Sequence, residues 1–232
     1  MTSSSKTKNI SQAVTSFQEL IATPFFGDIN AICWSRKLIG DFSDIVENIE
    51  LKGNMMELNP EVLGELQLSE QGQLARDILL NDMELLKEHG ASPILNVIKY
   101  YERDDSYLFF PTDVYSFHVD RSPLPVDTFL CTYHGTSSEI LPNSQAEQKI
   151  LVPEIREELK KLYDGKEEGF ESFLSEYFFD LHYQAKPNAS LINCGIGHLW
   201  KIATDNPKSQ FLPCIHRSPK EKMGENRLMI IC

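Results

Sequence analysis

The chain of 232 residues is 41% hydrophobic and 24% charged, an ordinary globular composition that can bury a substantial core in one large domain or in a core with attachments. Its formal net charge of −12 repels polyanions and argues against a broad nucleic-acid-binding face. No run approaches the ~20 apolar residues of a membrane helix, and the polar residues 1–9 lead into no apolar secretory segment. We therefore expect a cytoplasmic protein that binds neither nucleic acid nor a membrane. Its five cysteines lack CxxC spacing, which argues against a zinc ribbon or a disulfide framework.

Residues 1–92 are predicted to form a mainly helical region that packs on the rest of the chain. Apolar residues at helical spacing predict a helix over residues 11–22, and residues 29–34 form a short strand-like run. Three residues are placed to cap the start of later helices: Asp41, Asn59 and Ser69. Gly90 predicts the end of the last of these helices.

From residue 93 onward, short runs rich in β-branched and aromatic residues alternate with turn residues, a pattern typical of a barrel or sandwich. The predicted strands cover residues 94–101, 107–110, 115–121, 128–133, 189–194, 198–202, 211–216 and 227–232. Two amphipathic helices over about residues 145–186 interrupt this series as a helical insertion. The order of elements predicts an α+β fold in which residues 93–232 form an antiparallel barrel core.

One strand carries a motif that could bind a metal. Side chains alternate along a strand, so His118 and Asp120 point to one side while their apolar neighbours anchor the other. A second histidine from a distant strand would complete a set of two histidines and one carboxylate. This set suits non-haem Fe(II) and leaves coordination positions open for small molecules. His216 is the best candidate because it ends a predicted strand just before a polar loop.

The last predicted strand begins with an arginine that needs a partner. Arg227, Met229 and Ile231 share one face, and the other two residues of that face are apolar. A buried, unpaired guanidinium is very costly, so we expect Arg227 to bind a carboxylate or to lie at a rim. A carboxylate ligand is a natural partner because the planar guanidinium can bind it through two hydrogen bonds.

The order of His118-x-Asp120, His216 and Arg227 resembles the signature of the Fe(II)/2-oxoglutarate-dependent oxygenases. The wider pattern also resembles an uncharacterised bacterial domain-of-unknown-function family within that superfamily. The segments that carry the resemblance are residues 29–36, 117–120, 130–136, 216–219 and 227–228. The resemblance implies a double-stranded β-helix, which is a jelly-roll or cupin-like barrel, with N-terminal helices and a helical insertion.

The resemblance also implies roles for individual residues. His118, Asp120 and His216 would bind Fe(II), and Arg227 would bind the far carboxylate of the co-substrate 2-oxoglutarate. Tyr133, on the strand after the metal-binding motif, would make a second contact with 2-oxoglutarate. The protein would then use O2 to oxidise a small molecule or a protein side chain.

Two other functions stay open. The chain has Met229 where many members of the superfamily carry a small hydroxyl residue. A cupin-like metal enzyme that does not use 2-oxoglutarate is therefore the first alternative. The second is a non-catalytic binding module whose helical insertion contacts a partner. Among the other histidines, His182 ends an aromatic helix face and is interpreted as a core or surface residue, whereas His134 could line the cavity.

Overall fold

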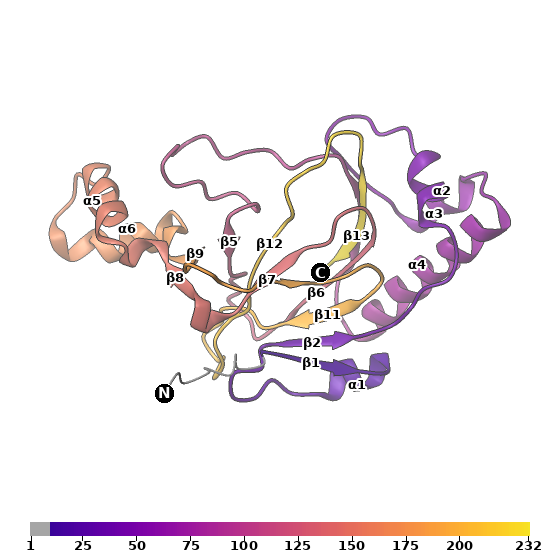
Figure 1. Ribbon diagram of the computed structural model, residues 1–232, viewed down its shortest axis with the longest axis horizontal. Helices are drawn as coiled ribbons and strands as arrows, with labels where there is room; N and C mark the ends of the chain where they lie inside the picture. Colours follow the sequence, from indigo (N-terminus) through magenta and orange to yellow (C-terminus); the bar gives the residue numbers. More distant parts are fainter. Residues whose placement is uncertain (1–9) are drawn as a thin grey trace.

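The computed structural model describes residues 10–232, which form two curved, mostly antiparallel sheets and six α-helices (Figure 1). The polar residues 1–9, where we expect no targeting segment, lie outside this range. The larger sheet has the order β1 (Ser11–Val14), β2 (Ala31–Trp34), β11 (Leu199–Ile202), β6 (Thr128–His134), β13 (Arg227–Ile231), β4 (Ile94–Ile98) and β3 (Met55–Glu57). The smaller sheet has the order β10 (Ile192–Asn193), β7 (Glu139–Leu141), β12 (Ile215–Arg217), β5 (Phe117–His118), β9 (His182–Ala185) and β8 (Ala146–Gln148). The α+β class is as predicted, and two curved sheets are compatible with a sandwich or a barrel.

The alternation of side chains along the strands divides the core into two compartments. Leu130, Trp200 and Met229 of the larger sheet join Ile140 of the smaller sheet in an apolar cluster, so these faces pack against each other. The opposite face of the larger sheet packs on the N-terminal helices, where Leu79 is fully buried. Neighbouring positions on one strand therefore face different surroundings, one between the sheets and one under the helices.

Four helices precede β4 in the chain, and α2–α4 lie together at one end of the molecule (Figure 1). They are α1 (Phe17–Ala22), α2 (Phe42–Glu47), α3 (Pro60–Glu65) and α4 (Glu70–Glu88). The three predicted caps are confirmed, because the side chains of Asp41, Asn59 and Ser69 each accept a hydrogen bond from a first-turn backbone N–H. Gly90 takes a φ of 92° just after α4, as the predicted helix end requires.

The helix predicted over residues 11–22 is wrong in its first half. Residues 11–14 form β1, which pairs in parallel with β2, and the helix begins only at Phe17. The Ser16 side chain accepts a hydrogen bond from the backbone N–H of Glu19, 3.1 Å away, and this cap fixes the start of α1. Strand pairing with β2 satisfies the preceding backbone groups, so tertiary context outweighs the helical spacing of the apolar residues.

The strand predicted over residues 107–110 is also absent. The Asp104 carboxylate accepts hydrogen bonds from the backbone N–H of Ser106 and from the Thr112 hydroxyl, and these bonds fold the segment into turns. Phe110 is fully buried within a cluster of aromatic residues from the helical insertion. The aromatic residues that made residues 107–110 look like a strand thus pack against the insertion and do not join a sheet.

The helical insertion extends from the smaller sheet at the end opposite α2–α4 (Figure 1). Its helices are α5 (Pro153–Lys161) and α6 (Phe170–Glu176), and its short 3-10 turns are η2 (Lys149–Leu151), η3 (Glu167–Gly169) and η4 (Phe179–Leu181), with η1 (Asn143–Gln145) just before β8. The predicted limits of about 145–186 are too wide for a purely helical segment, because the two ends are the paired strands β8 and β9. Phe178 takes a φ of 59° and ends the second helix early.

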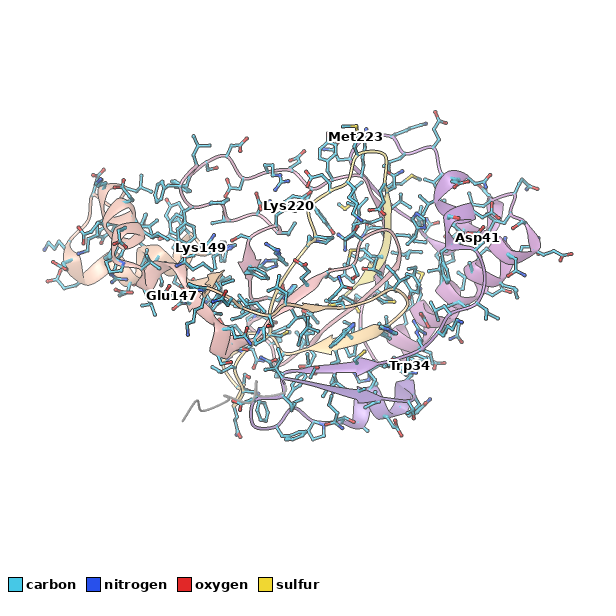
Figure 2. The ribbon with its side chains drawn as sticks, viewed as in Figure 1. Trp34, Asp41, Glu147, Lys149, Lys220 and Met223 are labelled. Carbon is cyan, nitrogen blue, oxygen red and sulfur yellow. The ribbon has the colours of Figure 1, made fainter. Side chains whose placement is uncertain are left out.

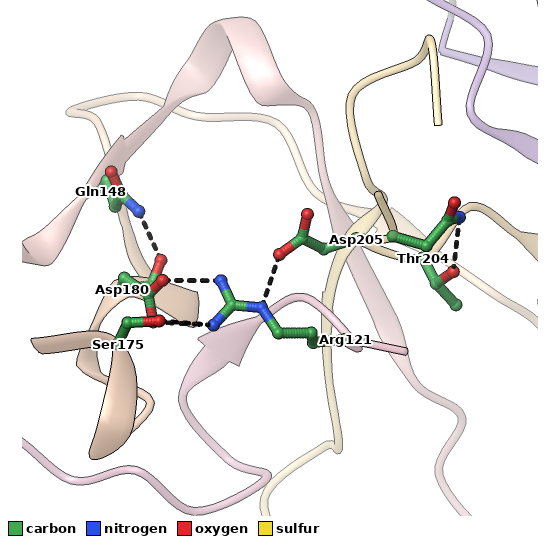
Figure 3. Close-up of polar contacts among 7 residues, drawn as sticks. Arg121, Gln148, Ser175, Asp180, Thr204 and Asp205 are labelled. Carbon is green, nitrogen blue, oxygen red and sulfur yellow. Dashed lines mark hydrogen bonds and ion pairs between the residues drawn. The ribbon is translucent and has the colours of Figure 1, made fainter. Parts of the chain in front are cut away.

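Arg121 links this insertion to the rest of the molecule (Figure 3). Its guanidinium donates to Asp180 at 2.6 Å and to Ser175 at 3.2 Å, both in the insertion, and to Asp205 at 2.7 Å in the loop after β11. The residue directly before it, Asp120, belongs to the predicted metal-binding motif. The residue that attaches the insertion, Arg121, therefore lies next to the candidate site.

Within residues 10–232, no helix combines the length and the apolar composition that a membrane span requires.

Candidate metal centre

The structure brings His118, Asp120 and His216 together. His118 on β5 and His216 on β12 are directly opposite each other in the antiparallel pair, with ring centroids 4.6 Å apart. The Asp120 carboxylate lies 3.9 Å from Nε2 of His118 and 3.7 Å from Nε2 of His216. One potential ligand atom from each residue lies within 4.8 Å of the others, which is close enough for one ion to contact all three.

Hydrogen bonds orient each of the three side chains. Nδ1 of His118 lies 2.8 Å from the Ser116 carbonyl, and Nδ1 of His216 lies 3.3 Å from the Cys214 carbonyl. If each Nδ1–H donates to its carbonyl, both Nε2 lone pairs face the carboxylate. The Thr128 hydroxyl donates to Oδ2 of Asp120 at 2.7 Å. Outer contacts of this kind fix the ligand orientation in metal sites.

The electrostatics favour the protonation states that metal binding needs. Burial, followed by the nearby His216, lowers the pKa of His118 to about 4, so its imidazole is neutral at neutral pH. Burial alone would raise the pKa of Asp120, but His216, the Thr128 hydroxyl and His118 outweigh it and hold the pKa below the usual 3.8. A neutral imidazole and an ionised carboxylate are the forms that bind a divalent cation.

The donor set limits which metals fit. Two imidazole nitrogens and one carboxylate oxygen are typical ligands of Fe(II), Zn(II) and related ions, whereas Ca²⁺ and Mg²⁺ prefer all-oxygen sites. Three protein ligands also leave coordination positions for small molecules. Because the side chain of Asp120 is 33% exposed while that of His216 is only 8% exposed, the cluster is accessible from one side and closed on another.

Arg227 lies on the face of the larger sheet that packs against the smaller sheet, since Met229, two residues later, belongs to the cluster between the sheets. The residue is only 6% exposed. Its Nη2 lies 3.4 Å from the Ser138 hydroxyl, while its Nε has no hydrogen-bond partner. Among residues 10–232 it forms no ion pair, and burial lowers its pKa. A buried guanidinium in this state fits a carboxylate ligand, because pairing would remove a large desolvation cost.

Tyr133, the expected second contact of 2-oxoglutarate, lies on the face of β6 opposite the one that packs against the smaller sheet. Its side chain points to the helix-covered face of β6, where it stacks on Phe42 with ring centroids 5.4 Å apart. Its hydroxyl donates to Oδ2 of Asp82 on α4 at 2.6 Å.

Two residues near the cluster were not predicted as site residues. His182 on β9 is directly opposite His118, is 4% exposed, and has a buried Nδ1 with no hydrogen-bond partner in the described part of the chain. Lys149, at the end of β8, donates to the Ser116 hydroxyl at 2.7 Å. The signal for both was hidden, because the sequence placed them inside the predicted helical insertion.

The chain matches no protein-family model, no curated protein and no solved structure. The function therefore has to be argued from the arrangement of the described residues.

Proposed function

We propose that this chain is an Fe(II)- and 2-oxoglutarate-dependent oxygenase on a double-stranded β-helix, acting on a small molecule or a protein side chain. One observation carries the proposal. Two histidines of the smaller sheet and the nearby Asp120 carboxylate form one cluster, and the larger sheet, which packs against the smaller one, carries a buried arginine that has no ion pair among residues 10–232. The first feature suits Fe(II), and the second suits the free carboxylate of a bound co-substrate.

Each side chain then has a stated task. His118, Asp120 and His216 hold the ion, and the carbonyls of Ser116 and Cys214 keep both imidazoles turned toward it. Fe(II) with 2-oxoglutarate supplies the O2 chemistry, which no protein side chain provides.

The remaining residues of the site bind the co-substrate and exclude water. Arg227 pairs with the distal carboxylate of 2-oxoglutarate and so sets the orientation of the co-substrate. The apolar residues between the sheets, such as Ile140 and Met229, keep water away from that ion pair and strengthen it. In this arrangement Met229 is a wall of the co-substrate pocket rather than a hydrogen-bonding residue.

The proposal is tested by anaerobic titration of the purified chain with Fe(II) and then with 2-oxoglutarate, followed by absorption spectroscopy. We expect the weak visible metal-to-ligand charge-transfer band of an Fe(II)–2-oxoglutarate complex. His216→Ala should abolish it, and Arg227→Met should raise the co-substrate concentration needed for half-saturation by about tenfold or more.

Arg217→Met is the matched control. Arg217 lies next to His216 but binds Glu139 at 2.7 Å and covers the ring of Phe117, on the opposite face of the sheet. This substitution should leave the band unchanged. Metal binding without a band would favour the cupin-like enzyme that does not use 2-oxoglutarate. A chain that binds no Fe(II) would contradict the proposal altogether.

A further inference from the structure

The candidate ligands are part of a longer row of side chains that crosses the smaller sheet. His216 on β12 is opposite His118 on β5, and His118 is opposite His182 on β9. On the next strand, Gln148 pairs with Tyr183, so Lys149, one residue further on, reaches the level of His182. Directly opposite residues point to the same face of a sheet. The row therefore runs from the metal cluster to a lysine.

Lys149 is a cation without a carboxylate partner in the described part of the chain. Its ammonium donates to the Ser116 hydroxyl at 2.7 Å and lies 5.0 Å from the ring centre of Phe110. Burial lowers its pKa, against a smaller opposite effect of Asp113. Figure 2 shows Lys149 where the helical insertion joins the sheets. Its charge is thus held beside the metal cluster, in partly apolar surroundings.

A surface pocket of about 360 Å³ opens at this point, and both Lys149 and Ser116 line it. Three aspartates also line the pocket: Asp104 accepts from Thr112, Asp113 accepts from the backbone N–H of Tyr115 at 3.0 Å, and Asp105 is exposed. The backbone carbonyl of Ser116 is also the hydrogen-bond acceptor of His118. Ser116 therefore lines the pocket and also orients His118 of the metal cluster.

The two cations lie on opposite sides of the histidines. Arg227 contacts Ser138, which directly precedes β7, whereas Lys149 directly follows β8. In the order of the smaller sheet, β12 and β5 lie between β7 and β8. One anionic group bound at each cation would thus have the metal between them. Since Arg227 suits the co-substrate, Lys149 is left for the substrate.

We propose that the substrate carries a carboxylate that binds the Lys149 ammonium and the Ser116 hydroxyl, in the pocket that both residues line. The reaction at the metal rests on the proposed function, but carboxylate binding does not. One ammonium and one hydroxyl suit a monoanion, and the three aspartates around the pocket oppose a phosphate dianion. His182, which pairs with His118, lies in the row between Lys149 and the metal cluster.

The test uses the full chain with Zn(II), a redox-inert ion, and saturating 2-oxoglutarate, so that Arg227 and the metal are occupied. Three pairs of probes, each an acid and its neutral amide, are titrated by saturation-transfer NMR: benzoate and benzamide, phenylacetate and phenylacetamide, hexanoate and hexanamide. We expect at least one acid to bind about ten- to a hundredfold more tightly than its amide. Lys149→Met should remove this preference, and Lys149→Arg should restore part of it.

Lys220→Met is the matched control, because Lys220 lines the same pocket but is exposed. This substitution should keep the preference for the acid. The inference is overturned if no acid is preferred over its amide, if the preference survives Lys149→Met, or if Lys220→Met removes it equally. If Zn(II) does not bind, the proposed function fails, and the same titration of the metal-free chain still decides whether Lys149 binds carboxylates.

Discussion

Asp82 on α4 is fully buried, and three hydrogen bonds share its carboxylate. The Arg36 guanidinium binds both oxygens, with Nη1 at 2.7 Å from Oδ1, and the Tyr133 hydroxyl donates to Oδ2 at 2.6 Å. A buried charge is tolerated only when it is paired and hydrogen-bonded in this way. The network therefore joins β6, α4 and the segment after β2 under the larger sheet.

The first prediction concerns Tyr133. Tyr133→Phe removes one hydrogen bond to a charged group, but the Arg36 ion pair continues to satisfy Asp82. We expect the free energy of unfolding in urea to fall by about 1.5–3 kcal/mol. Binding of Fe(II) and 2-oxoglutarate should be unchanged, because the hydroxyl lies on the face away from the metal cluster. Weaker 2-oxoglutarate binding in this variant would return Tyr133 to the site.

The second prediction concerns pH. Burial, with His118 and Lys149 nearby, lowers the pKa of His182 to about 3, below the usual 6.5. The unfolded chain therefore takes up a proton in this range while the folded chain does not. Stability is fully present above pH 6.5 and is lost as the pH falls from 6.5 toward 3, by up to about 1.4 kcal/mol per pH unit for this residue.

Urea unfolding of the metal-free chain at pH 7, 6 and 5 measures this effect. His182→Gln cannot titrate, so its unfolding free energy should fall less steeply between pH 6 and 5 than that of the unchanged chain. The comparison is between slopes, so a constant loss of packing in the variant does not matter. Equal slopes would show that His182 is not held neutral by the fold.

At the scale of elements, Arg121 attaches the helical insertion through hydrogen bonds to Ser175 and Asp180 in the insertion and to Asp205 after β11 (Figure 3). Its side chain is 33% exposed, so each ion pair contributes only about 0–1 kcal/mol. We expect Arg121→Gln to speed backbone hydrogen exchange mainly in residues 149–181, with little change in the overall unfolding free energy. Arg156→Gln breaks an ion pair inside the insertion, with Glu171, and should leave the exchange of the flanking strands unchanged. Faster exchange throughout both sheets in Arg121→Gln would show that the arginine supports the whole fold.

The elements that could be predicted from the sequence are those with local signals. The caps at Asp41, Asn59 and Ser69 depend on side chains within one turn of the helix start, so the pattern alone locates them. β1 could not be predicted, since four residues become a strand only because β2 lies beside them. The early end of the second insertion helix depends on the left-handed backbone of Phe178, a conformation that a bulky residue rarely adopts and that no sequence pattern announces.

In the candidate site, too, the residues with a local signal could be predicted and those placed by strand pairing could not. The spacing of His118 and Asp120 puts both on one side of a strand by simple alternation, and the structure brings His216 to them. Lys149 and His182 join the row only through the pairing of β8 with β9 and of β9 with β5, which is a matter of register between distant segments. Register is not encoded in any short motif, so the sequence left both residues within the predicted helical insertion.

At the scale of the molecule, the larger sheet mixes strands from distant parts of the chain. β2 pairs with β11, and β13 lies between β4 and β6. Such pairing closes long loops, and the loss of chain entropy comes before the stabilising contacts form. We therefore expect slow folding for a domain of this size. The region before residue 93 supplies β1, β2 and β3 to this sheet, besides its four helices.

β5 is only two residues long, yet it separates β12 from β9 and carries His118 at the middle of the row. A single residue pair, His118 with His216, joins it to β12. An ion held by these two residues would cross-link two segments that lie about a hundred residues apart in the chain. Without the ion, a single residue pair joins β5 to β12, so we expect proteolysis near β5 to be faster in the metal-free chain. The lifetime of the protein in a metal-poor cell would then follow its metal supply.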